Sequence, residues 1–214
     1  ASARLSDHIV RSMTLMGAFR AGDDHDACEV TTLHSASELR FAGHGSSEPV
    51  RGEDGCVDSP AAAFIDRTLR AEAWEWRTWA DGYASVGGLR VYGASVGAIR
   101  GAVRDALRRH RGLQHDDITA LASELWAVPV FERRLAAIVL LQGQAGTLIG
   151  NDLTRIEGFL RDARVPDLIE PLALDVVRPL LARLTGTEAD RARRIVARWA
   201  TADAQGLRAA AALV

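Results

Sequence analysis

Apolar residues recur at helical spacing through most of the chain after residue 58. In the range 116–126 they lie at i, i+3, i+4, i+7 and i+8: Ile118, Leu121, Ala122, Leu125 and Trp126. This spacing places them on one face of a helix. Ser59 and Pro60 form a favourable N-cap and first-turn pair. The pattern predicts an all-α domain over residues 59–214.

Capping residues and helix breakers set the expected boundaries within this domain. They predict helices over 95–111, 116–126, 129–142, 152–163 and 166–184, and a last one from about 204 to the end. Thr187 and Asp190 resemble a capping box that would begin a further helix.

The predicted helices form pairs that repeat along the chain. The first helices of successive pairs begin at Asp117, Asp152 and Asp190, which are 35 and then 38 residues apart. HEAT-type helical pairs repeat at about 40 to 47 residues, a little longer than this. One pair cannot bury its own apolar face, so neighbouring pairs must cover it. We therefore expect an α-solenoid of HEAT-like antiparallel helical pairs with a concave basic groove.

The N-terminal part has a different composition. Residues 1–60 carry 5 Arg against 10 Asp and Glu, whereas residues 61–214 carry 21 Arg against 18 acidic residues. Residues 1–58 are also rich in Gly, Ser and His, which predicts a loosely structured or disordered acidic extension. Its histidines and cysteines, such as His25 and Cys28, fit no standard zinc spacing, so we expect no metal site.

Composition excludes several functions. The chain contains no lysine, so all 26 basic residues are arginines, which removes Schiff-base and lysine-nucleophile chemistry. No apolar run approaches the roughly 20 residues that span a bilayer. We expect a cytoplasmic monomer without a membrane partner, associated with the nucleoid when it is bound.

Equivalent positions of the repeated pairs suggest a ligand surface. Arg134, Glu170 and Arg208 each lie near the start of a second helix. In a solenoid they would line one face, where arginines favour a polyanion and the carboxylate favours a cationic group. The arginines could instead pair with Glu132, Asp162 or Asp203 and hold the repeats together. The sequence leaves both interpretations open.

Two segments resemble a known family. Residues 91–100 read Val-Tyr-Gly-Ala-Ser-Val-Gly-Ala-Ile-Arg, and residues 125–137 contain Leu-Trp followed by Arg-Arg-Leu-Ala-Ala. With Arg198-Trp199 and Leu207-Arg208-Ala209-Ala210, they resemble the AlkD family of HEAT-repeat DNA alkylation repair glycosylases. The resemblance covers the chain from about residue 64 onward.

The resemblance implies roles for individual residues. The family's Trp-Asp-x-x-Asp motif corresponds to residues 166–170, so Pro166 replaces the tryptophan, Asp167 keeps the first acid and Glu170 replaces the catalytic aspartate. The family's DNA-contacting arginine corresponds to Arg208, and its N-terminal aromatic contact to Tyr83. The remaining expected phosphate contacts are Arg133, Arg134 and Arg164.

The implied activity is that of a monofunctional DNA glycosylase in base excision repair. It would excise cationic N3- or N7-alkylated purines from duplex DNA and would need no cofactor or metal. Two alternatives remain: a catalytically inactive relative that binds DNA of unusual structure, and a helical-repeat scaffold for protein partners.

Overall fold

A computed structural model describes residues 58–72 and 86–214 of the chain. These residues are mainly helical and contain no β-strand, only isolated bridges between Val86 and Leu89 and between Arg90 and Val130. The prediction of an all-α domain is confirmed. None of the helices in these two ranges combines the length and the apolar character that crossing a bilayer requires. The acidic extension, apart from Asp58, and Tyr83 lie outside the described residues.

The helices follow one another through short connections. Their bounds are α2 (Pro60–Glu72), α4 (Val96–Arg109), α5 (His115–Ala127), α6 (Phe131–Gly143), α7 (Asp152–Asp162), α8 (Pro166–Pro171), the π-helix η1 (Leu172–Val177), α9 (Arg178–Arg183), α10 (Gly186–Trp199) and α11 (Gln205–Leu213).

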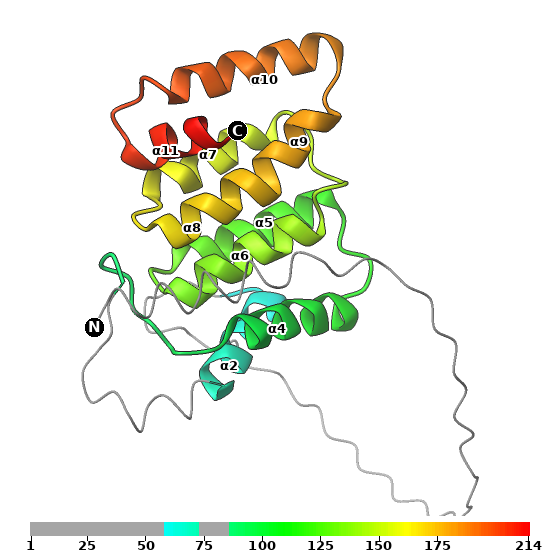
Figure 1. Cartoon of the computed structure of the whole chain (residues 1–214). Coiled ribbons are helices and arrows are strands. Elements are labelled where there is room, and N and C mark those ends of the chain that lie inside the picture. Colours follow the sequence, from blue (N-terminus) through cyan, green and yellow to red (C-terminus); the bar gives the residue numbers. More distant parts are fainter. Residues whose placement is uncertain (1–57, 73–85) are drawn as a thin grey trace, which may run out of the picture.

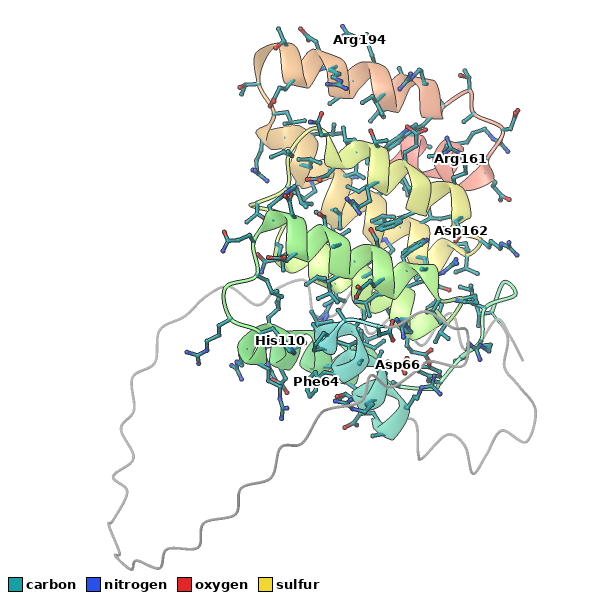
Figure 2. The ribbon with its side chains drawn as sticks, turned by 180° about the vertical axis from the view of Figure 1, so that it is seen from behind. Phe64, Asp66, His110, Arg161, Asp162 and Arg194 are labelled. Atoms are coloured by element: carbon teal, nitrogen blue, oxygen red, sulfur yellow. The ribbon has the colours of Figure 1, made fainter. Side chains whose placement is uncertain are left out.

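Successive helices pack as pairs laid side by side. The pair α5 and α6 makes the most extensive contact, and α10 packs on α11. The second helices also touch in turn: α4 lies against α6, α6 against α8 and η1, and both of these against α11. They form the near side in Figure 1, and Figure 2 shows α5, α7 and α10 on the opposite side.

Helix α6 lies at the centre of this packing. Every residue from Phe131 to Ile138 is buried, including three charged ones. Across the next interface, Trp126 at the end of α5 stacks on Phe159 of α7, with ring centroids 4.6 Å apart. The apolar faces predicted from periodicity are therefore covered by neighbouring helices, as expected.

Several predicted helix starts are displaced by a few residues. Helix α4 begins after Ser95 as predicted, since the Ser95 hydroxyl accepts a hydrogen bond from the Ala98 amide at 3.1 Å. Helix α10 begins at Gly186 with Thr185 as its N-cap, so the capping box predicted at Thr187 and Asp190 is wrong. Gly186 has φ of +56°, a left-handed conformation that glycine adopts readily, and the helix begins two residues earlier than the capping box predicts.

One long predicted helix, residues 166–184, contains a π-helical interruption. The segments α8, η1 and α9 follow without a break from Pro166 to Arg183. Pro179 has no N–H, so the carbonyl of Asp175 lacks its usual partner four residues later. A wider π turn next to a proline accommodates the missing bond.

Candidate functional site

Glu170 is an exposed carboxylate at the fifth of the six residues of α8. Among the residues that the structure describes, nothing forms a hydrogen bond or ion pair with it. A side chain that only packed against its neighbours would not need a charge at this position. The side chain is therefore available to a ligand at the surface formed by the second helices.

Glu170 does not occupy the same helical position as Arg134 and Arg208. Counted from the first residue of each helix, Arg134 and Arg208 are fourth, Glu170 is fifth, and Ile169 is fourth in α8. One residue turns a side chain by about 100° around a helix. Arg134 is also buried, whereas Glu170 and Arg208 are exposed, so the three do not form the expected single row at the surface.

Arg134 is held by the next helical pair. Its side chain is 6% exposed, its Nη2 lies 2.5 Å from Asp162 Oδ2, and its Nη1 donates to the Asp162 carbonyl at 3.2 Å. The guanidinium also lies over the Trp126 ring, 5.1 Å from its centroid. Burial lowers the pKa of Arg134, and Asp162 opposes this effect. This is the pairing that the sequence offered as the alternative to DNA contact.

Arg133 is buried in an ion-pair cluster. Its side chain is 3% exposed and binds both oxygens of Asp58 at 2.8 and 2.9 Å and Asp66 Oδ1 at 3.1 Å. The Tyr92 hydroxyl donates to the same Asp66 oxygen at 2.8 Å. The Asp58 and Asp66 carboxylates raise the pKa of Arg133 against the effect of its burial. Its guanidinium faces the interior and is not presented to a phosphate.

Arg164 and Arg208 are the expected phosphate contacts that lie at the surface. Both are exposed. Arg208 donates to the carbonyls of Ala202 and Asp203, at 2.7 and 2.6 Å, and no carboxylate within residues 58–72 and 86–214 pairs with it. Arg164 lies close enough to Arg134 to lower the pKa of that group by repulsion.

A glycine turn fixes the approach to α8. Gly87 has φ of +60°, and a Cβ atom there would lie 2.3 Å from Val165 Cγ1. Only glycine allows this backbone conformation and this close contact without strain. The turn therefore presses on Val165, which is the N-cap of α8 and directly precedes Pro166.

Pro166 and Asp167 form the first turn of α8 and differ in exposure. Pro166 is exposed at the first helical position, where its missing N–H is not needed. Asp167 is buried, with 8% exposure, and interacts with its surroundings. Asp167 therefore supports the start of the helix, and Glu170 is the carboxylate at the surface.

Sequence reasoning missed Asp175, which lies one wide π turn beyond Glu170. Burial raises the pKa of this half-buried carboxyl, and the charges of Arg100 and Arg178 act in the opposite direction. The sequence feature that could have indicated the π turn carrying Asp175 is the pair of prolines, Pro171 and Pro179, inside one predicted helix.

The carboxylate of Glu132 accepts hydrogen bonds from the backbone that precedes α4. Its two oxygens accept the amides of Tyr92 at 2.9 Å and Gly93 at 2.6 Å. Burial raises the pKa of Glu132, and these backbone hydrogen bonds oppose the shift. Gly93 has φ of +93°, so Glu132 fixes a turn before α4 that favours glycine.

Within residues 58–72 and 86–214, no three histidine, cysteine or acidic side chains gather as metal ligands. His25 and Cys28 lie outside the described residues, so the expectation for that segment stays a prediction.

Comparison with known proteins gave one finding. A sequence model of a family described as DNA alkylation repair enzyme matches residues 62–214. A search of curated proteins gave no match.

Proposed function

Because the chain belongs to the DNA alkylation repair enzyme family, we propose that it is a monofunctional DNA glycosylase that excises cationic N3- or N7-alkylated purines from duplex DNA. The observation that carries this proposal is Glu170, an exposed carboxylate without an ionic partner among the described residues. It stands where the resemblance in sequence places the catalytic acid.

The reaction requires electrostatic stabilisation more than proton donation. An N3- or N7-alkylated purine already carries a positive charge, so its glycosidic bond breaks with the electron pair moving to the base, which leaves neutral. The sugar gains oxocarbenium character, and a fixed carboxylate beside the anomeric carbon stabilises it. A water then forms the new bond to that carbon, and Glu170 accepts the released proton.

The remaining parts of the site support this step. Arg164 and Arg208 would hold phosphates beside the lesion, because guanidinium groups bind phosphate oxygens through paired hydrogen bonds. Asp167 would position the helix that carries Glu170. Since the chain has no lysine, the product is an abasic site and not a lysine-mediated strand break. This hydrolytic step uses no metal or cofactor.

The identity of residue 166 as proline affects the size of the purine adduct that the site can accept. It replaces an aromatic side chain by a smaller exposed ring at the first position of α8. We expect the site to accept purine adducts larger than methyl, since less side-chain volume adjoins Glu170.

Single-turnover release of 7-methylguanine and of a bulkier N7 adduct from defined duplexes tests the function. Glu170→Gln should abolish release of both bases while duplex binding is kept. Glu188→Gln is the matched control, because Glu188 is an exposed carboxylate near the start of α10, and its release rate should equal that of the native protein.

Other results separate the alternatives. Duplex binding without base release from folded native protein would indicate an inactive DNA-binding relative. Absence of salt-dependent DNA binding would favour a protein-interaction scaffold. Activity confined to methylated purines would overturn the consequence drawn from Pro166.

A further inference from the structure

A row of arginines on α4 borders a shallow hollow away from Glu170. The hollow has a volume of about 530 Å³. Its arginines are Arg100, Arg104, Arg108 and Arg111, and its apolar and neutral lining includes Val103 and Leu107 of α4 and Val139, Gly143 and Gln144 at the end of α6. Arg100, Arg104 and Arg108 recur every four residues on α4, so they follow one helical face for about 12 Å, and Arg111 lies two residues beyond the end of the helix.

The middle arginines of the row remain accessible. The side chains of Arg104 and Arg108 are 63% and 69% exposed, and among the described residues their ion-pair partner is Asp105, at 3.4 and 3.7 Å. Arg111 donates its Nε to the backbone carbonyl of Arg108. One exposed carboxylate at these distances neutralises little of the charge of this row.

Helix α4, which lines the hollow, and the helix that carries Glu170 both pack on α6. Arg100 acts electrostatically on Asp175 of η1, one wide turn beyond Glu170 in the same continuous helix. Helix α6 packs between α4 and η1 and contacts both, and Figure 1 shows α4, α6 and the α8 to α9 helix on the same side. Both α4 and the helix that carries Glu170 therefore lie on the side to which we assign DNA binding.

We propose that the α4 hollow is a second phosphate-binding site, which holds the sugar–phosphate backbone of duplex DNA at a distance from the damaged base. The inference rests on the proposed function for the choice of DNA as the occupant. An exposed row of bidentate donors over an open, partly apolar floor suits a continuous polyanion better than a single small anion. Such contacts fix the position of the duplex and carry no sequence information.

The test measures binding of an undamaged duplex as a function of salt. Each phosphate contact contributes about 0.9 to the slope of log K against log salt concentration. Arg104→Gln combined with Arg108→Gln should lower the slope by roughly 1.8 and weaken binding at 0.1 M salt by roughly tenfold or more. The matched control combines Arg191→Gln with Arg194→Gln, two exposed arginines on α10, at the other end of the stack in Figure 2.

The outcomes distinguish this site from the glycosylase proposal, because undamaged duplex reports binding without chemistry. Base release at saturating DNA should keep its native rate in the α10 control variant, since neither Glu170 nor the α4 row is changed. An unaltered slope in the folded α4 variant, or an equal loss in the α10 control, would overturn the site. Equally tight, α4-dependent binding of polyglutamate would show that the occupant is an acidic polypeptide. Absence of base release from the native protein would overturn only the proposed reaction.

Discussion

Replacing Arg133 by methionine should destabilise the fold strongly and not act as the loss of a DNA contact. The guanidinium is 3% exposed and joins Asp58 on one side of the cluster to Asp66 on the other. Arg133→Met fills the volume of the side chain but leaves two carboxylates without the cation between them. Asp66 still forms an ion pair with Arg70, whose Nε lies 2.7 Å from its carboxylate. Asp58 therefore loses the larger share of its ionic stabilisation.

The magnitude follows from burial. Removing one partner of a fully buried ion pair costs about 3 to 5 kcal/mol. Since the Asp58 and Asp66 side chains keep 16% and 13% exposure, water partly compensates them, and we expect about 3 kcal/mol. Urea unfolding followed by far-ultraviolet circular dichroism measures this loss as a lower midpoint at an unchanged slope.

The control is Arg193→Gln. Arg193 is 74% exposed and pairs with Asp190 within α10, so its replacement should change the free energy of unfolding by less than about 0.5 kcal/mol. Arg133→Lys keeps the charge but loses the paired geometry and should give an intermediate loss. A cost below about 1 kcal/mol for Arg133→Met would refute the structural role assigned to this arginine.

Two further predictions concern stability. Hydrogen bonds with Asp152 and Asp116, both at 2.8 Å, raise the pKa of His115 above its usual 6.5; the resulting stabilisation is complete below about pH 6.5 and is lost as the pH rises through the folded-state pKa. Unfolding of His115→Gln between pH 6 and 9 should lack this decline, and an identical pH profile would contradict the assignment. Gly206→Ala should cost about 1 to 3 kcal/mol, because the added Cβ would lie 2.0 Å from the Leu160 carbonyl oxygen. Gly158→Ala, where nothing lies within 4 Å, is the matched control and should be neutral or stabilising by up to about 1 kcal/mol in thermal unfolding; equal losses in the two variants would show that the contact is not responsible.

Local chemistry made most helices predictable. Ser95 caps α4 and Pro166 begins α8, as the sequence predicted, because these residue types act on the backbone next to them. The start of α10 was not predictable in this way. A capping box at Thr187 satisfies the same local rules for a helix start, but the helix begins at Gly186.

The candidate site was predictable only in part. Residue order and resemblance identified Glu170, and the structure places it at the surface. They also grouped Arg133 and Arg134 with Arg164 and Arg208, although the first two are buried and ion-paired. All four have the same side chain, so composition cannot distinguish an arginine that binds a phosphate from one that joins helices.

The sequence by itself predicted a helical domain after residue 58 and excluded lysine chemistry, and the resemblance pointed to Glu170 as the candidate acid. These properties depend on residue type and on spacing along one chain. Only the tertiary structure decided which charges are available, because burial depends on the helix that packs against each residue. Asp162 of the following pair covers Arg134, whereas Arg208 is exposed and donates to the backbone carbonyls of Ala202 and Asp203.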